Sequence, residues 1–199
     1  EQHISNVKVA CSNHARGTKI MKLEDFVRVY DGVVSPASCK RIIDEFESQK
    51  EFVQNHDTPL YKFQQLDLNQ TPEMLGLAQA YVGSLYPCYE DYFNRLNLRE
   101  FVSLDNWEDV RIKKYIKGST DEFKTHVDVT DHASAARFCI AIMYLNDNDG
   151  LTTFPTLGLA VQPKAGRVVI FPPTWMYPHN GLTPTDEDKY IMMTCLHYR

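Results

Sequence analysis

The sequence predicts a mainly β protein with helices in its N-terminal half, that is, an α+β fold class. Two helical patterns lie between residues 35 and 98, and each begins with a hydroxyl residue followed by proline. From about residue 109 onward, short apolar runs alternate with Gly, Pro, Asn and Asp, which is typical of an all-β sandwich or barrel. No linker separates the two parts. We therefore expect one domain over residues 1–199, with helical support at 35–98 and a jelly-roll core at about 109–199.

The first elements are expected in the following order. Residues 1–22 lack periodicity and predict a loose arm or an edge strand. Residues 24–31 alternate briefly and predict a strand. A helix follows, with Ser35 as its cap, Pro36 in its first turn and an apolar stripe that ends near Ser48–Lys50.

The next elements complete the N-terminal half. Residues 51–59 are polar and predict a loop, whereas residues 60–68 predict a strand. Thr71 and Pro72 begin a second, longer helical pattern. Pro87 lies inside this pattern and is expected to kink the helix, because an interior proline removes a backbone hydrogen bond.

The C-terminal half contains a series of predicted strands separated by turn residues. Each run is short and rich in β-branched or aromatic residues. The predicted strands are residues 110–117, 122–129, 136–145, 151–154, 158–161, 168–171 and 190–198.

Composition narrows the classes of function. The formal net charge of −5 disfavours a general nucleic-acid or membrane-surface binder. No run of about 18 apolar residues predicts a membrane span, and the N-terminus shows no signal peptide. The five cysteines are widely spread and predict buried, reduced thiols. We therefore expect a cytoplasmic protein, bacterial or phage-encoded; the oligomeric state is left open.

His126 and Asp128 are the first candidates for a metal site. They lie in a predicted strand, where residues two apart point to the same face, about 6–7 Å from one another along the backbone. His179, in Tyr-Pro-His-Asn-Gly, is the candidate third ligand. Two histidines and one carboxylate leave about three positions of an octahedral ion open, which is the arrangement of non-haem Fe(II) oxygenases.

In order and spacing, these motifs resemble the 2-oxoglutarate/Fe(II)-dependent dioxygenases, specifically the prolyl 4-hydroxylase-like branch. The core of the resemblance is His126-x-Asp128, then His179, then Lys189 ten residues later. Tyr115, Tyr144-Leu-Asn, Phe154-Pro155 and Gly166-Arg-Val-Val-Ile-Phe-Pro also fit. The resemblance covers roughly residues 24–199, most closely 110–199. It implies a double-stranded β-helix core, Fe(II) as metal, 2-oxoglutarate and O2 as co-substrates, and succinate and CO2 as products.

The resemblance also implies roles for individual residues. Lys189 would be the counter-ion of the far carboxylate of 2-oxoglutarate, because an unpaired charge inside the barrel is costly. Tyr144 and Tyr115 would donate hydrogen bonds to the co-substrate. The chain departs from the family where two glycines are common, since Asp149-Gly150 stands there, and Met193 is expected to share the inward face of Lys189.

Four further residues are candidates for substrate or co-substrate contacts. Alternation does not decide whether Thr152 or Thr153 faces the co-substrate, and Thr153 is the candidate here. The other three candidates are Arg167, Trp175 and His132. The lysines at 113, 114 and 117 are expected to form a solvated face.

The predicted function is hydroxylation of an unactivated C–H bond, with a prolyl residue in a peptide or protein as the expected target. A free amino acid or another small molecule is the alternative substrate. An alternative of another class is a non-catalytic, metal-binding jelly-roll recognition module. The ligand set disfavours it, because a module has no need of three open metal positions. No membrane partner is expected.

Overall fold

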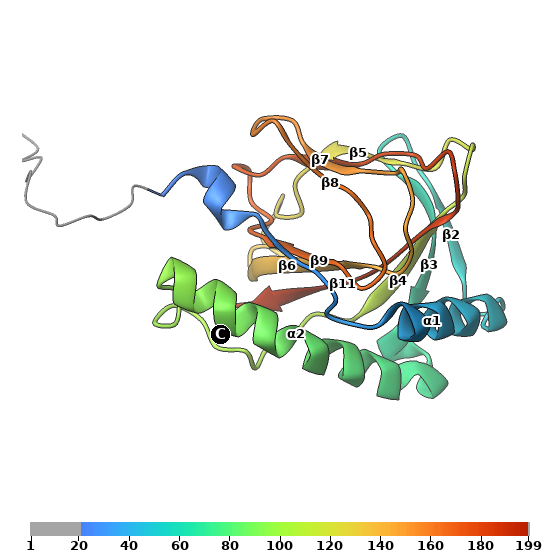
Figure 1. Cartoon of the computed structure of the whole chain (residues 1–199), viewed down its shortest axis with the longest axis horizontal. Coiled ribbons are helices and arrows are strands. Elements are labelled where there is room, and N and C mark those ends of the chain that lie inside the picture. The colour runs from blue at the N-terminus through green and yellow to red at the C-terminus, as the bar shows by residue number, and fades with distance from the viewer. Residues whose placement is uncertain (1–20, 199) are drawn as a thin grey trace, which may run out of the picture.

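The structure is a computed structural model that describes residues 21–198, and Figure 1 shows it as mostly β-sheet with two main helices. The predicted arm at residues 1–22 lies almost entirely outside the described residues. The helices are α1 (Pro36–Ser48) and α2 (Leu75–Leu96), with short 3-10 helices η1 (Leu23–Phe26), η2 (Leu68–Gln70) and η3 (Pro72–Met74). The strands are β1 (Arg28–Tyr30), β2 (Gln54–Asp57), β3 (Lys62–Asp67), β4 (Arg111–Tyr115), β5 (Phe123–His126), β6 (Arg137–Tyr144), β7 (Thr152–Phe154), β8 (Leu159–Val161), β9 (Val168–Phe171), β10 (His179–Gly181) and β11 (Lys189–His197).

The strands form two antiparallel sheets. The larger sheet has the order β1-β9-β6-β11-β4-β3-β2, and the smaller has the order β5-β10-β7-β8. The small sheet covers one face of the large sheet, and α1 and α2 cover the other (Figure 1). The molecule is therefore layered as helices, large sheet and small sheet.

The central strands alternate between these two interfaces, as the two-residue period of a strand requires. On β6, Ala141 and Met143 pack toward the helices, whereas Ile142 and Tyr144 pack toward the small sheet. Strand β11 alternates in the same way. Side chains that point between the sheets are the ones available to build a site there.

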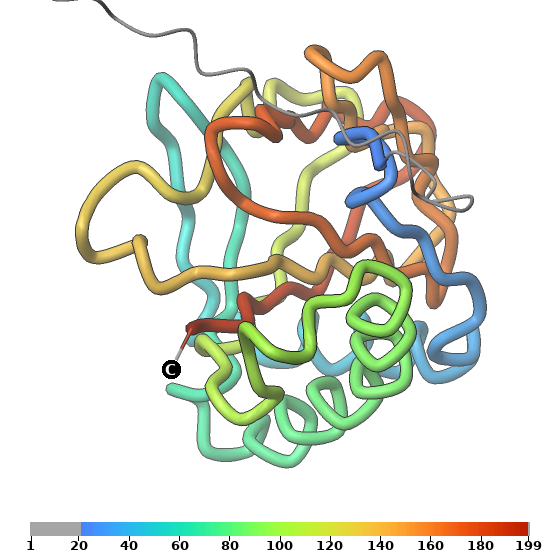
Figure 2. The backbone as a smooth tube through the Cα atoms, turned by 90° about the vertical axis from the view of Figure 1, so that its left-hand side faces the viewer, coloured from blue at the N-terminus to red at the C-terminus, as the bar shows by residue number. Residues whose placement is uncertain are grey.

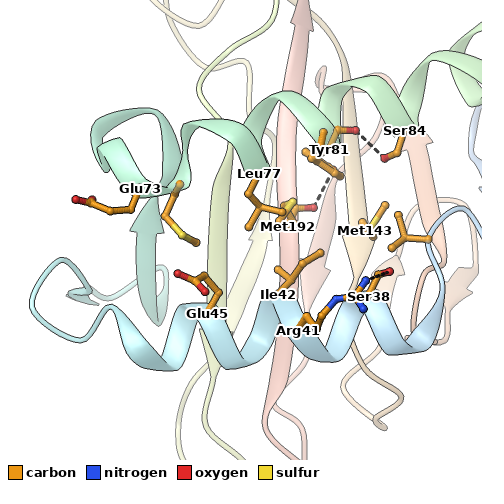
Figure 3. A pocket seen from close by; sticks show the side chains of 13 residues that line it. Ser38, Arg41, Ile42, Glu45, Glu73, Leu77, Tyr81, Ser84, Met143 and Met192 are labelled. Atoms are coloured by element: carbon orange, nitrogen blue, oxygen red, sulfur yellow. Dashed lines mark hydrogen bonds between the residues drawn. The ribbon is translucent and has the colours of Figure 1, made fainter.

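The two helices leave a groove on the outer face of the large sheet (Figure 3). Its volume is about 520 Å³, and Leu77 and Ile42 face one another across it. Tyr81 of α2 crosses to the sheet, where its hydroxyl donates to the carbonyl of Met192 at 2.9 Å. This bond fixes α2 against β11.

Several predictions for the N-terminal half are confirmed. Ser35 caps α1 by accepting a hydrogen bond from the backbone N–H of Ser38, and Pro36 is in the first turn. Strand β3 lies within the predicted residues 60–68. The long second helix is confirmed as α2, which runs without a break through Pro87, while the kink expected at Pro87 stays a prediction.

Two predictions for this half are wrong. Residues 24–31 are not one strand, because η1 occupies Leu23–Phe26 and only three residues, β1, pair with β9. Residues 51–59 are not all loop, because β2 pairs with β3. Strand β2 is polar and largely exposed, so its pairing is fixed by its neighbour rather than by an apolar pattern.

In the C-terminal half, the structure confirms strands within all seven predicted segments. No helix in residues 21–198 is long and apolar enough to cross a membrane. The four cysteines in this range are free and buried, as predicted: Cys39, Cys88, Cys139 and Cys195.

Candidate active site between the two sheets

His126, Asp128 and His179 converge between the sheets. His126 ends β5 and His179 begins β10, and the two residues are directly opposite in the strand pairing. The Nε2 atom of His126 lies 3.7 Å from Oδ1 of Asp128, and that of His179 lies 3.5 Å from Oδ2. The three possible ligand atoms all lie within 4.8 Å of one another, so they are able to hold one metal ion.

The backbone route to this arrangement differs from the prediction. Strand β5 ends at His126, and Asp128 lies in a bend beyond it, so the two side chains do not share a strand face. The bend is held by the backbone N–H of Asp128, which donates to the carbonyl of Pro173 at 3.0 Å. The predicted strands also do not include residues 179–181, yet His179 belongs to β10. After Asp128 the chain loops outward before β6 begins (Figure 2).

Hydrogen bonds set the tautomer of both imidazoles. The Nδ1–H of His126 donates to the carbonyl of Lys124 at 2.7 Å, and that of His179 donates to the carbonyl of Tyr177 at 3.2 Å. Both Nε2 atoms are therefore left as acceptors that face Asp128. Burial lowers the pKa of His126 to about 4, with a further contribution from His179, and burial also lowers the pKa of His179. Both rings are neutral at pH 7, as metal ligation requires.

Asp128 provides the negative charge of this group. Its Oδ2 atom is buried and has no hydrogen-bond partner among the described residues. Leaving a buried carboxylate oxygen unpaired is costly unless a cation binds there. Two neutral imidazoles and a carboxylate with a free oxygen therefore fit a divalent transition-metal ion such as Fe(II).

Lys189 forms a second polar centre in the same cavity. Its side chain is 1% exposed, and its Nζ donates to the carbonyl of Gly150 at 2.6 Å. The ammonium lies 5.4 Å from the ring centre of Tyr115 and 6.0 Å from that of Tyr144. Burial lowers the pKa of Lys189 to about 7. A buried ammonium with one carbonyl partner is suited to bind an anion.

Tyr144 and Thr152 complete this end of the cavity. The Tyr144 hydroxyl is buried and forms no well-aligned hydrogen bond with the described residues; burial raises its pKa, and its neighbour Thr152 opposes this effect. Thr152 lines the cavity beside Lys189, whereas Thr153 donates to the Asn180 side chain at 2.6 Å instead. Thr152, rather than the predicted Thr153, is therefore the threonine of the cavity. Phe154 points inward from the same strand, so the alternation places Thr153 on the opposite face.

The other three predicted contacts lie elsewhere. Arg167 forms an ion pair with Asp31 and donates to the carbonyl of Gln162. Trp175 is 76% exposed, and His132 is exposed in the loop before β6. None of these three side chains lines the cavity of His126 and His179.

Lys113 is a residue of the site that the sequence prediction placed on a solvated face. It is only 7% exposed, and it lines both the metal-ligand cavity and an open cleft beside it. Burial lowers its pKa to about 8, although the Asp128 carboxylate opposes this effect. A sequence signal did exist, because Lys113 is two residues from Tyr115 on the same strand and therefore shares its inward face. Lys114 points the other way and pairs with Glu47.

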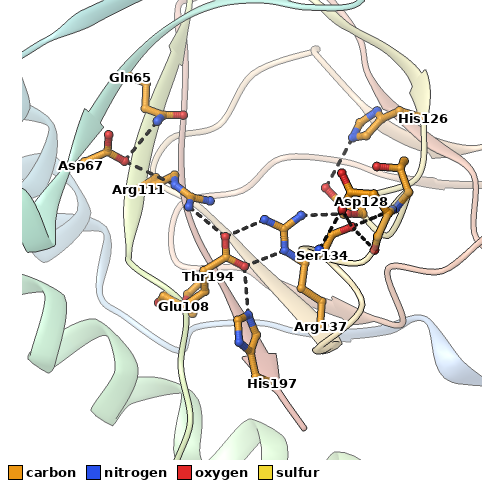
Figure 4. Close-up of polar contacts among 12 residues, drawn as sticks. Gln65, Asp67, Glu108, Arg111, His126, Asp128, Ser134, Arg137, Thr194 and His197 are labelled. Atoms are coloured by element: carbon orange, nitrogen blue, oxygen red, sulfur yellow. Dashed lines mark hydrogen bonds and ion pairs between the residues drawn. The ribbon is translucent and has the colours of Figure 1, made fainter.

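Glu108 and Arg137 support the bend that carries Asp128 (Figure 4). Arg137 donates from Nε and Nη2 to the Glu108 carboxylate, and from Nη1 to the backbone carbonyl of Asp128 at 2.8 Å. Burial alone would raise the pKa of Glu108, but hydrogen bonds from Arg137 and Arg111 outweigh it and hold the pKa at about 2. The sequence offered no signal for this network, since its members are distant along the chain.

Comparisons with known proteins agree with this geometry. Residues 110–197 match the model of the 2OG-Fe(II) oxygenase superfamily. No curated protein sequence matches the chain significantly. Among solved structures, the viral collagen prolyl hydroxylase of Paramecium bursaria Chlorella virus-1, in its 2OG complex, is similar with a TM-score of 0.62 and 19% identity, over 85% of this chain and 94% of that chain.

Two cellular prolyl hydroxylases share the fold as well. A prolyl-4-hydroxylase of Pseudomonas putida has a TM-score of 0.64 and 15% identity, over 87% of this chain and 93% of that chain. A prolyl hydroxylase from Trichoplax adhaerens, in complex with a hypoxia inducible factor peptide fragment, has a TM-score of 0.64 and 14% identity, over 87% of this chain and 84% of that chain.

The matched segment contains every residue of the convergent group. By this match, residues 110–197 resemble the 2-oxoglutarate/Fe(II)-dependent dioxygenases. The fold of the chain is that of the prolyl hydroxylases named above. The matched superfamily implies Fe(II), with 2-oxoglutarate and O2 as co-substrates, and the His-Asp-His group is able to hold the metal ion.

Proposed function

We propose that His126, Asp128 and His179 hold Fe(II), and that Lys189, Tyr144 and Tyr115 bind 2-oxoglutarate. One observation carries this assignment: two neutral imidazoles and an unpaired carboxylate oxygen converge in the cavity that also contains a buried lysine. The two sheets would then be the halves of a double-stranded β-helix core. We also propose that the helices and this core form one domain, because α1 and α2 pack directly on the large sheet.

Each of these residues has a definite task in such a reaction. The three ligands would hold the metal ion at the end of β5. When bound, Fe(II) supplies the O2 activation that couples oxidation of 2-oxoglutarate, with release of succinate and CO2, to hydroxylation of a C–H bond. The Lys189 ammonium neutralises the far carboxylate of the co-substrate, and the Tyr144 hydroxyl donates a hydrogen bond to it.

Binding of 2-oxoglutarate requires a small rearrangement. The space between the proposed metal ligands and Lys189 is about 30 Å³, which is less than a dicarboxylate needs. The Lys189 ammonium would release the Gly150 carbonyl and turn toward the incoming carboxylate. A carboxylate is the stronger partner of the two, because it carries a full negative charge, whereas the Gly150 carbonyl is neutral.

The proposed reaction is hydroxylation of a prolyl residue in a peptide or protein. The prolyl hydroxylase fold supports this proposal, and so does the open cleft of about 420 Å³ beside Asp128. Its lining combines aromatic side chains, including Tyr61 and Phe63, with polar ones. Such a cleft is suited to an extended chain with a ring at its floor.

The test is succinate formation by Fe(II)-loaded protein once O2 is admitted, with a proline-rich peptide present or absent. Succinate that rises with the peptide, together with a peptide mass increase of one oxygen atom, is the expected result. His126→Ala should lose iron and turnover together, while His132→Ala, an exposed control six residues away, should retain both. Full activity of His126→Ala would contradict the ligand assignment.

A free amino acid or another small acid is the second candidate substrate. One observation favours it, namely the buried Lys113 at the junction between the cavity and the cleft. Succinate that ignores the peptide but rises with an amino acid would select this candidate.

A further inference from the structure

Lys113 is a buried positive charge without a matching anion. Lys113 is only 7% exposed, yet its side chain forms no salt bridge and no hydrogen bond with any described residue. Its Nζ lies over two aromatic rings, 4.2 Å from the ring centre of Phe63 and 5.1 Å from that of Phe123. These rings attract the ammonium but do not accept its three N–H donors as oxygen atoms would.

Apart from Asp128, a proposed metal ligand, the other charges around the cleft are matched. Arg111 pairs with Asp67 and Glu108, and Arg137 pairs with Glu108. The charges would also cancel in the loaded site: the positive charges of Fe(II) and Lys189 equal the negative charges of Asp128 and the 2-oxoglutarate dianion. Lys113 therefore adds one positive charge that nothing balances, in a position where isolated charges are costly.

Lys113 lies between the cavity of the proposed metal ligands and the open cleft beside it, and a substrate must reach from the cleft into the cavity. It is the middle residue of three that face inward along β4: Tyr115 lies at the co-substrate end and Arg111 at the outer end. Asp128, a proposed metal ligand, lines the same two spaces. A group bound to Lys113 would thus lie at the floor of the cleft, next to the metal.

We propose that Lys113 is a specificity-determining residue that binds a carboxylate of the substrate, so that the enzyme acts on a carbon a few bonds from that carboxylate. This inference rests on the proposed function of the site. The carboxylate could belong to a free amino acid or small acid, or to the C-terminus of a peptide; the chemistry that Lys113 recognises is the same. A carboxylate supplies oxygen acceptors to the ammonium and removes the excess charge.

The test uses pairs of ligands that differ only in a carboxylate and its amide. The panel contains the free amino acids with their amides, and prolyl peptides with a free or an amidated C-terminus. Binding is measured by the shift in thermal unfolding of the full chain, loaded anaerobically with Fe(II) and 2-oxoglutarate. The wild type should bind at least one carboxylate about 10- to 100-fold more tightly than its amide, the usual size for a charged hydrogen bond.

Lys113→Met should bind the two members of that pair alike, and Lys113→Arg should restore part of the difference. Lys114→Met is the matched control, because it removes the same charge from the same strand but on the opposite face, and it should keep the difference. The ligand-free Lys113→Met protein should also unfold at a higher urea concentration than the wild type, since a buried unpaired charge is lost; a merely structural lysine would give the opposite sign.

Three outcomes would overturn the proposal: amides that bind the wild type as well as the acids do, a carboxylate preference that survives in Lys113→Met, or no binding by any carboxylate of the panel. The ligand assignment of the iron site is tested separately by succinate formed without any added substrate. Absence of that succinate, with Lys113-dependent carboxylate binding intact, would overturn the iron and 2-oxoglutarate assignments and leave the carboxylate site standing.

Discussion

The Lys189 ammonium and the Gly150 carbonyl are joined by a 2.6 Å hydrogen bond in a buried part of the cavity. Gly150 also leaves room for the lysine stem. A Cβ at this position would lie 3.2 Å from Cδ of Lys189 and 2.9 Å from the carbonyl oxygen of Leu182. The lysine proposed to bind 2-oxoglutarate is thus positioned by a residue that has no side chain.

Gly150→Ala should lower both stability and 2-oxoglutarate affinity, because the new methyl group displaces either the Leu182 backbone or the lysine stem. We expect a loss of roughly 1–3 kcal/mol in the free energy of unfolding, as for other overpacked sites. Urea unfolding and 2-oxoglutarate titration would measure the two effects. Gly83→Ala is the control, because Gly83 is an exposed position of α2 where a Cβ meets nothing within 4 Å. Its free energy of unfolding should rise by about 0.5–1 kcal/mol, and 2-oxoglutarate binding should not change. Unchanged binding in Gly150→Ala would show that Lys189 does not need this glycine.

Tyr144→Phe should separate stability from co-substrate binding. The Tyr144 hydroxyl is buried without a partner, so its removal should stabilise the ligand-free protein by up to about 1 kcal/mol. The affinity for 2-oxoglutarate should fall about 10-fold if this hydroxyl donates to the co-substrate. Tyr89→Phe removes another buried, unpartnered hydroxyl in the core beneath α2, and it should change stability alone. Equal 2-oxoglutarate affinity in both variants would exclude Tyr144 from the binding site.

The buried state of Lys189 should give the ligand-free protein a specific pH dependence. Its pKa is about 7 in the folded protein and 10.5 in the ordinary, exposed state, so between these values the unfolded chain binds a proton that the folded protein does not. Stability should therefore rise with pH across this window, and the Lys189 contribution should be lost as pH falls toward 7. Urea unfolding of wild type and Lys189→Met at pH 7 and pH 9 would show a larger gain for the wild type. Added 2-oxoglutarate should reduce this gain, because a bound carboxylate favours the charged lysine. If the stability of the two proteins changed with pH in parallel, Lys189 would not have the lowered pKa.

Arg137→Met should weaken metal binding, although Arg137 is not a proposed ligand. Its Nη1 donates to the Asp128 carbonyl, so its loss frees the bend that aims the carboxylate. We expect metal affinity to fall about 10-fold, as is usual when a supporting hydrogen bond of a metal ligand is removed. Metal titration of the folded protein would measure this, with Arg137→Lys as an intermediate case. Arg95→Met breaks an exposed helix pair with Asp91 and should leave metal affinity unchanged, so a similar loss in that control would point to a general effect of charge.

Much of this protein was determined by local sequence. The helix start at Ser35-Pro36 and the alternating runs of the C-terminal half rest on short-range geometry, and they predicted those elements well. At Thr71-Pro72 the same signal was less accurate, because the short 3-10 helix η3 lies there and α2 begins only at Leu75. The class of chemistry was indicated by the identity and order of four residues: His126, Asp128, His179 and Lys189. These signals survive because each depends on residues a few positions apart or on a fixed chemical role.

The tertiary structure decided what local periodicity does not encode. Asp128 reaches the proposed metal site through a bend held by Pro173, which is distant in sequence, and by Arg137, which lies beyond the next loop. Thr152 faces the cavity and Thr153 does not, because strand pairing fixes which face of β7 is turned inward. The sequence placed Lys113 with two other lysines on a solvated face. It is buried because the small sheet packs over β4. The physical reason is the same in each case: burial is a property of what packs on a residue, and the chain segments that pack here are far apart in sequence.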